Sequence, residues 1–282
     1  MLFALTTFGN VETLDGGVSI TQPLLYAGTG NLGSYSGSDT FLTADDEGTS
    51  AANYPWKQFY ATIRLDNIDV AKNQGSSAVL RVVENEIMRV EMSISEELDV
   101  QFNADGTGNG SKDFNGLSNL VLDTNTVGGI DSAGAGNSWW QSSVNALSGS
   151  VTFAAMRTRY TAVSEGNDFP TNIFTTELVY NAIDALFTSS QRFMDPTMAN
   201  QGFETIMFHG APISFDRNVT AGDMFFLNLK YFTLYKLGPN WFKMSDWLEP
   251  VNQDIRIKKI ILYGELAISN RKRQGLETGV TA

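Results

Sequence analysis

Hydrophobic and polar residues alternate strictly over residues 56–65, and a period of two is typical of a β-strand. Residues 22–54, which precede this strand, are polar and rich in glycine. They contain too few apolar residues to bury themselves, so we predict an extended two-stranded arm that lies on another surface, with residues 56–65 as its return strand. The two faces of this strand are Lys57, Phe59, Ala61, Ile63 and Leu65 on one side, and Trp56, Gln58, Tyr60, Thr62 and Arg64 on the other.

A helical pattern follows the arm and runs without a break over residues 76–103. Its apolar positions recur every three or four residues and therefore share one stripe of a helix: Leu80, Val83, Ile87, Val90, Ile94 and Leu98. At 1.5 Å per residue such a helix is roughly 40 Å long. An arm that leads into one long helix is typical of a protein that assembles rather than one that catalyses a reaction.

The rest of the chain alternates between helix and strand patterns, which indicates an α+β fold. We predict helices over residues 152–165 and 177–193, with a short buried strand at residues 172–175 between them. Further strands are expected at residues 205–209, 213–215, 224–237 and 255–269, with a loop over residues 238–251. Residues 1–21 are predicted to be an irregular lead-in.

Charge is distributed unevenly along the chain. The net charge of −12 argues against a protein that binds nucleic acid by neutralising phosphates. The first basic residue is Lys57, and the acids before it are Glu12, Asp15, Asp39, Asp45, Asp46 and Glu47. Residues 251–282 are instead rich in bases: Arg256, Lys258, Lys259, Arg271, Lys272 and Arg273. These two regions either attract each other, within one chain or between copies, or form two independently solvated surfaces.

The residue types that carry enzyme chemistry are scarce. The chain has no cysteine and a single histidine, His209, so thiolate metal sites and Ser-His-Asp or Cys-His catalysis find no support. The glycine-rich loop at residues 105–110 lacks the Gly-Lys-Ser/Thr ending of a phosphate-binding loop. We therefore predict no catalytic, cofactor-binding or metal-binding residue and no enzyme activity.

Two short clusters are candidate interaction sites, and long apolar runs are absent from the sequence. Residues 45–47 either bind a hard cation or form a solvated tip. Trp139 and Trp140 are either a carbohydrate or partner platform, or packing groups of a core or interface. No stretch reaches the roughly 20 apolar residues of a membrane span, and the N-terminus lacks the pattern of a signal peptide. We expect a soluble chain made in a cytoplasm.

Several segments occur in an order that resembles one protein family. They are residues 9–17 and 23–26, the stretch through Tyr35-Ser36-Gly37, residues 51–57, the long helix, residues 105–110 with Gly116-Leu117, residues 251–254 and residues 269–275. In this order the chain resembles the major capsid proteins of tailed bacteriophages with the Hong Kong 97-type fold. The resemblance covers nearly the whole chain and rests on layout rather than on a short signature.

The resemblance implies a division of the chain into parts. These would be an N-terminal arm at residues 1–21, an extended β-hairpin loop over a neighbouring subunit at 22–68, a peripheral domain at 69–124 with its spine helix at 76–103, an axial domain around the capsomer axes at 125–250, and C-terminal strands that return to the peripheral domain at 251–282.

The resemblance also implies a function and partners. Copies of the chain would self-assemble into pentamers and hexamers of an icosahedral head, which encloses double-stranded DNA without sequence-specific binding. Scaffolding, portal and decoration proteins would be partners, with assembly in the host bacterial cytoplasm and a final place in the virion. The residues expected at inter-subunit contacts are Tyr35, Phe41, Asp45, Asp46, Glu47, Trp56, Phe59, Arg271, Lys272 and Arg273.

The chain departs from the family pattern in two respects. Some members cross-link through a lysine on the extended loop, but residues 1–56 contain no lysine, so we expect no such cross-link here. Some members also begin with a long scaffolding segment, and we expect no such segment before Met1. We expect either a separate scaffolding protein or a trimmed, mature chain.

Two other functions are compatible with parts of the sequence. An encapsulin-like nanocompartment would share the fold, but its cargo pocket needs an N-terminal helix, which the glycines at positions 9, 16 and 17 disfavour. A β-rich hydrolase or carbohydrate-binding module would need a catalytic constellation that the sequence does not contain.

Overall fold

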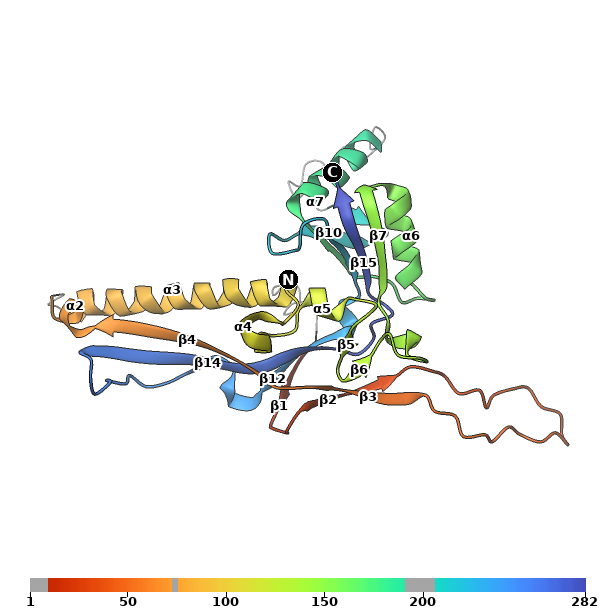
Figure 1. Cartoon of the computed structure of the whole chain (residues 1–282), viewed down its shortest axis with the longest axis horizontal. Coiled ribbons are helices and arrows are strands. Elements are labelled where there is room, and N and C mark those ends of the chain that lie inside the picture. The colour runs from red at the N-terminus through yellow and green to blue at the C-terminus, as the bar shows by residue number, and fades with distance from the viewer. Residues whose placement is uncertain (1–9, 73–75, 191–205) are drawn as a thin grey trace.

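The computed structural model describes residues 10–72, 76–190 and 206–282, which form an α+β fold with two lobes (Figure 1). The elongated lobe is built on a five-stranded sheet and the compact lobe on a six-stranded sheet. A large hydrophobic core fills the elongated lobe and reaches the junction, and a second core fills the compact lobe. The fold class predicted from the sequence is confirmed.

The sheet of the elongated lobe joins strands from both ends of the chain. Its strand order is β1 (Asn10–Leu14), β12 (Phe232–Leu237), β14 (Ile255–Ile268) and β13 (Lys243–Met244), with β4 (Lys57–Asp66) also paired to β14. The β4 pairing is antiparallel and runs from Lys57 opposite Gly264 to Asp66 opposite Ile255. The alternation predicted for this strand is present, because Ile63 is buried whereas Tyr60 is exposed.

The long helix α3 (Ser76–Asn103) lies along β4 (Figure 1). Its bounds agree with the prediction. Ile94 and Leu98 are buried and Ile87 packs against the same core, so the predicted apolar stripe faces the body; the side chain of Leu80 lies outside the described residues. The flanking helices are α2 (Asn67–Lys72), α4 (Gly108–Ser111) and α5 (Leu117–Leu120).

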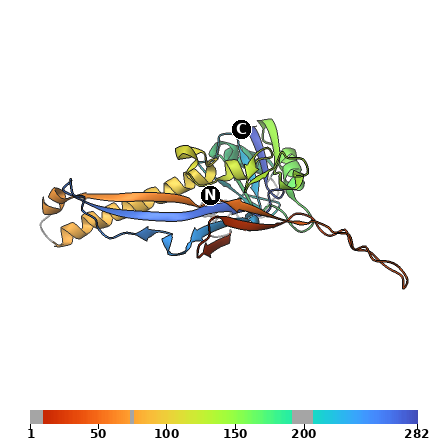
Figure 2. The ribbon, with the colours of Figure 1, turned by 60° about the horizontal axis from the view of Figure 1, so that its bottom comes forward.

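The arm is an antiparallel hairpin of β2 (Ile20–Leu25) and β3 (Thr49–Tyr54). Between these strands, residues 26–48 run outward, and the two halves of this loop stay together out to the tip (Figures 1 and 2). The prediction that residues 56–65 return the arm is therefore wrong, because β3 takes that place and β4 joins the five-stranded sheet of the elongated lobe, called the central sheet from here on. The pattern missed β3 because its residues are small and polar apart from the buried Ala52 and Tyr54.

The compact lobe packs two helices on its sheet (Figure 1). The strand order is β7 (Ser143–Ser150), β15 (Gly275–Thr281), β11 (Met224–Leu227), β8 (Asn172–Thr175), β10 (Ala211–Phe215) and β9 (Met207–Phe208). The helices are α6 (Phe153–Val163) and α7 (Glu177–Ser190). The hydroxyl of Thr152 accepts a hydrogen bond from the Ala155 amide at 3.2 Å and caps α6. The predicted strand at residues 172–175 agrees with β8, while residues 191–193 and 205 lie outside the described residues.

Two predicted segments divide between the lobes. The strand expected at residues 224–237 breaks at Asn228, whose side chain accepts a hydrogen bond from the Lys230 amide and caps the short helix η3 (Leu229–Tyr231), so β11 and β12 lie in different sheets. Residues 251–282 likewise supply β14 to the elongated lobe and β15 to the compact lobe. The C-terminal strands therefore do not all return to one domain.

Four shorter elements and β1 complete the described fold. The hairpin of β5 (Thr126–Val127) and β6 (Ile130–Asp131) precedes η1 (Ser138–Trp140), and η4 (Gly238–Asn240) lies in the predicted loop at residues 238–251. The lead-in is not wholly irregular, because β1 pairs in parallel with β12. Its sequence, Asn-Val-Glu-Thr-Leu, is short and mostly exposed, which leaves a weak strand pattern.

Candidate assembly surfaces and the lobe junction

The base of the arm is fixed to the body by Tyr54. Its side chain is 1% exposed, and its hydroxyl donates a hydrogen bond to the Ile268 carbonyl at 3.0 Å and accepts one from the Ile268 amide at 3.3 Å. Burial raises the pKa of Tyr54, so the phenol stays neutral. The amide of Asn53 adds a bond to the Gly128 carbonyl at 2.8 Å. The direction in which the arm leaves the body is therefore set by buried contacts.

Aromatic stacking extends this attachment along the arm. Tyr26 stacks on Trp139, with ring centroids 4.4 Å apart, and Trp139 contacts Trp140. Trp140 is buried and its indole N–H donates to the Val127 carbonyl at 3.1 Å. Of the two interpretations of this tryptophan pair, packing within the subunit agrees with the structure. A cleft of about 320 Å³ lies beside it, between the arm and residues 269–273.

The outer part of the arm exposes both apolar and acidic side chains. Tyr35 and Phe41 are 69% and 63% exposed and meet edge to face, with centroids 5.1 Å apart. Asp46 accepts a hydrogen bond from the Gly30 amide, which ties the two halves of the loop together. Asp45 and Glu47 are exposed. This surface has apolar groups to bury and negative charge to neutralise.

The remaining predicted contact residues differ in accessibility. Trp56 and Phe59 are half-buried against the core of their own chain, and the Trp56 indole donates to the Gly17 carbonyl at 2.9 Å. Lys272 is exposed. Arg271 is 0% exposed, so the expectation that it contacts a neighbouring subunit needs correction.

Arg271 instead holds the interior of its own chain. It donates to the carbonyls of Leu120 and Leu122 at 2.9 and 2.5 Å and to the Asn125 side chain at 2.5 Å. Burial lowers the pKa of Arg271 to about 10, so it remains charged at neutral pH. The sequence reads as a surface cluster, Arg271-Lys272-Arg273, and gives no signal that its first member turns inward.

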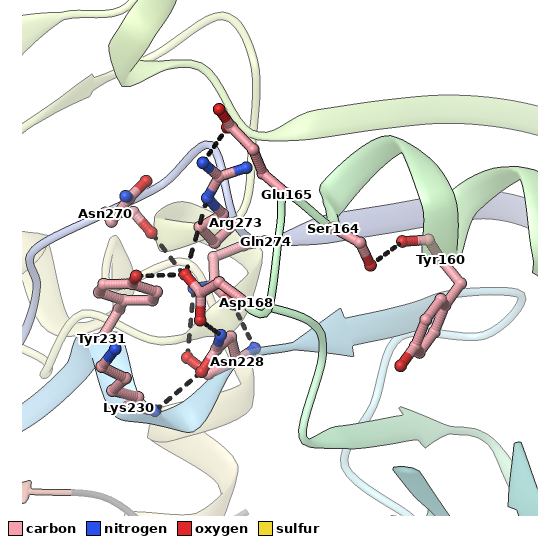
Figure 3. Close-up of polar contacts among 10 residues, drawn as sticks. All are labelled: Tyr160, Ser164, Glu165, Asp168, Asn228, Lys230, Tyr231, Asn270, Arg273 and Gln274. Atoms are coloured by element: carbon pink, nitrogen blue, oxygen red, sulfur yellow. Dashed lines mark hydrogen bonds and ion pairs between the residues drawn. The ribbon is translucent and has the colours of Figure 1, made fainter. Parts of the chain in front are cut away.

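A polar network at the lobe junction involves Arg273 (Figure 3). Arg273 pairs with Glu165 and lies 3.7 Å from Asp168, both in the turn after α6. Asp168 accepts hydrogen bonds from the Asn228 amide group at 2.8 Å and from the Tyr231 hydroxyl. The network therefore links the turn after α6 to the two segments that connect the sheets.

The network shifts the pKa values of two of its members. The hydrogen bond and charge of Arg273 lower the pKa of Glu165. Burial, followed by the carboxylate of Asp168, raises the pKa of Tyr231 to about 12. Gln274 completes the junction, because its side chain accepts a hydrogen bond from the main-chain amide of Asn228 at 2.9 Å and donates one to the main-chain carbonyl of Asn228 at 3.3 Å. Sequence patterns missed this site, whose members come from three distant segments.

One face of the β4–β14 ladder forms an exposed basic strip. Tyr60 is 74% exposed, and Arg64 is exposed on the same face because alternate residues of a strand point the same way. Lys259 lies opposite Thr62, so it shares this face, together with the half-buried Ile257 and Ile261. Asp66 lies on the same face and pairs with Arg64 at 3.0 Å, so the basic strip combines the charge of Lys259 and the Arg64–Asp66 pair with apolar side chains.

Within residues 10–72, 76–190 and 206–282, no group of three or more His, Cys, Asp or Glu side chains is arranged to hold a metal ion. In the same residues, no helix combines the length and hydropathy that a membrane crossing requires.

Comparison with known proteins identifies the fold. No protein-family model matches the sequence, and no curated protein is similar to it. The capsid of cyanophage A-1(L) contains a chain that matches with a TM-score of 0.73 at 16% identity, over 99% of this chain and 92% of that one. A capsid chain of Myoviridae phage XM1 matches with a TM-score of 0.62 at 12% identity, over 99% and 92%. An encapsulin from Synechococcus elongatus matches with a TM-score of 0.60 at 11% identity, over 98% and 87%.

These likenesses show that the chain has the Hong Kong 97-type fold, as the resemblance implied. At these identities a shared fold establishes the arrangement of the chain, whereas the function depends on the chain's own surfaces.

Proposed function

We propose that this chain is the major capsid protein of a tailed bacteriophage, a structural subunit of pentamers and hexamers in an icosahedral head around double-stranded DNA. The observation that carries the proposal is the arm, which projects from the body of a Hong Kong 97-type fold (Figure 1). Its outer part exposes the apolar side chains of Tyr35 and Phe41. A monomer rarely leaves such groups uncovered, whereas a second copy of the chain covers them.

Charge supports a neighbouring copy as the surface that receives the arm. Residues 10–56 contain acids and no base, while the basic strip presents Lys259 and Arg64, the second of which also pairs with Asp66. Half of the loop at residues 26–48, about 11 residues, reaches roughly 36 Å when extended, enough to cross a neighbouring subunit. Complementary charges of this kind set register and specificity more than affinity.

The proposed inter-subunit residues follow from exposure. Tyr35, Phe41, Asp45, Asp46 and Glu47 contribute the arm side of the interface, and Lys272 a basic group near the arm base. Trp56, Phe59 and Arg273 take part only through the part of their surface that the subunit itself leaves uncovered.

The two lobes take the two roles of the family's layout. The elongated lobe serves as the peripheral domain with α3 as its spine, and the compact lobe serves as the axial domain around the capsomer axes. Scaffolding, portal and decoration proteins are the proposed partners, and the chain has a structural rather than a catalytic role. Assembly in the host cytoplasm and a final place in the virion follow from the same proposal.

A nanocompartment shell is the second candidate, and the likeness to an encapsulin supports it. The two functions differ in their contents, which are nucleic acid for a phage head and enzyme cargo for a nanocompartment. Particle contents therefore separate them where fold does not.

Electron microscopy of the purified chain, with light scattering on the same sample, tests the proposal. We expect closed particles tens of nanometres across, formed by the chain alone or together with a co-expressed scaffolding protein. A chain that stays monomeric under both conditions contradicts the proposal.

A deletion of residues 30–46 tests the arm separately, because it leaves the β2–β3 pairing intact. The deletion variant should fold but fail to close shells. A matched variant with Asp45→Asn, Asp46→Asn and Glu47→Gln keeps the arm's length and should close shells more slowly. Closed shells from the deletion variant contradict the role assigned to the arm.

A further inference from the structure

Glu265 is a buried acid where the arm, the central sheet and the loop after α3 meet. It lies in β14 and is 0% exposed. Its Oε1 accepts hydrogen bonds from the amides of Asn115 and Leu266, both at 2.9 Å. Its Oε2 has no hydrogen-bond partner among the described residues. A buried carboxylate oxygen without a donor favours the protonated form, and burial raises the pKa of Glu265 to about 8.

Adjacent positions of one strand pair hold the loop after α3 at two points, in addition to the buried Phe114, whose amide donates a hydrogen bond to the Gln101 side chain at 3.3 Å. The Lys57 ammonium, at the start of β4, donates a hydrogen bond to the Ser111 carbonyl. Glu265 holds the Asn115 amide from β14, and the residue before it, Gly264, pairs with Lys57. Both attachments therefore move with the same part of the central sheet.

The held loop has an unfavourable backbone conformation. Asn109, Gly110 and Ser111 have φ values of 52°, 70° and 65°, three left-handed residues in succession. Asparagine and glycine adopt this conformation readily, whereas the side chain of Ser111 makes it costly, and such positions persist when surrounding contacts hold them. Loss of the contact at Ser111 should therefore loosen residues 109–112, while Phe114 stays anchored.

Among the described groups around Glu265, Lys57 is the candidate for its charge partner. Tyr235 lies directly opposite it across the β12–β14 pair, and Tyr54 approaches from the arm base. Burial raises the pKa of both phenols, that of Tyr235 to about 12, so both are neutral when Glu265 titrates. The loop contributes the Asn115 amide, and Lys57 contributes the positive charge that favours ionised Glu265.

We propose that Glu265 and Lys57 form a proton-controlled latch on the loop at residues 104–116. While Glu265 is protonated, the Lys57 ammonium stays on the Ser111 carbonyl and the loop is closed. When Glu265 releases its proton to solvent, the ammonium moves to Oε2 and the Ser111 carbonyl loses its donor. The latch thus couples the end of α3 to the base of the arm, and it belongs to the subunit whether or not shells form.

Tryptic cleavage after Lys112, which lies in this loop, measures loop opening. The unassembled full-length chain is digested at pH 6 and pH 9, with cleavage after Lys243 as the internal reference. We expect the wild-type rate to equal that of Glu265→Gln at pH 6 and to exceed it about tenfold at pH 9. If the wild type and Glu265→Gln are cleaved after Lys112 at equal rates at both pH values, the proposal is overturned. The control Glu249→Gln, an exposed acid paired with Arg256, should follow the wild type at both values.

A second variant keeps the proposal testable if Glu265→Gln does not fold. Lys57→Gln has no ammonium to move, so Ser111 should be released at both pH values. Its cleavage after Lys112, relative to cleavage after Lys243, should match the fast wild-type ratio at pH 9 already at pH 6. A slow ratio at pH 6, equal to the wild type, overturns the proposal.

Discussion

The hydroxyl of Tyr54 is the attachment of the arm whose removal has the most predictable effect. Tyr54→Phe removes one oxygen atom and leaves the ring, so it creates no large cavity. The change deprives the Ile268 amide and carbonyl of a partner in a site where Tyr54 itself is 1% exposed. Each net hydrogen bond contributes roughly 0.5–1.5 kcal/mol, and buried groups left unpaired cost more. We expect the free energy of unfolding to fall by about 2 kcal/mol.

Urea denaturation followed by tryptophan fluorescence measures this change, with calorimetry as a second readout. For a chain of this size, about 2 kcal/mol corresponds to a drop in Tm of roughly 4–8 °C. Both proteins must be compared at one subunit concentration, because association raises apparent stability. Tyr60→Phe is the matched control, since that side chain is 74% exposed, and it should change stability by less than about 0.5 kcal/mol. A Tyr54→Phe variant as stable as the control refutes the reasoning.

Three further predictions concern buried charge and pH. Arg159→Leu should lower the free energy of unfolding, measured by urea denaturation, by about 3 kcal/mol, because it leaves the buried Glu277 carboxylate without its ion-pair partner at 2.8 Å. Arg256→Leu breaks an exposed ion pair and should change the free energy of unfolding little. Equal effects of the two substitutions contradict this interpretation. Arg271→Met should cost about 3 kcal/mol through the unpaired carbonyls of Leu120 and Leu122, while Lys272→Met stays within about 0.5 kcal/mol, and calorimetry of both variants decides. Burial raises the pKa of Asp223 from 3.8 to about 6, so its contribution favours folding below pH 4 and is lost as the pH rises to 6. Because Asp223 is only half-buried, Asp223→Asn should gain about 1 kcal/mol at pH 7 and nothing at pH 4, and a gain that is the same at both pH values rejects this assignment.

Helices and isolated buried strands were predictable because their patterns are local. The apolar stripe of α3 repeats over many turns, and Thr152 marks the start of α6 as a cap. Strand pairing was harder to predict from the sequence, because it depends on residues far apart in the chain. The clean alternation of residues 56–65 fitted equally well a return strand of the arm and a strand of the central sheet, and the pattern alone does not choose between them.

The candidate site shows the same limit. Exposure of the arm followed from its polarity, and Tyr35 and Phe41 are exposed as expected. The inward turn of Arg271 was not predictable, since its partners are backbone carbonyls, which no side-chain pattern reveals. The junction around Asp168 joins segments from three regions of the chain, each of which is ordinary on its own.

The break at Asn228 has a mechanical consequence. In the described residues the chain passes between the lobes three times: just before β7, at residues 228–231, and at residues 269–274. Two lobes joined by one segment can rotate against each other, whereas lobes joined by three segments that are hydrogen-bonded to one another resist both rotation and sliding. Each copy of the chain should therefore behave as a stiff unit. In the shell proposed here, changes of angle between copies would then occur at the interfaces between them rather than within each copy.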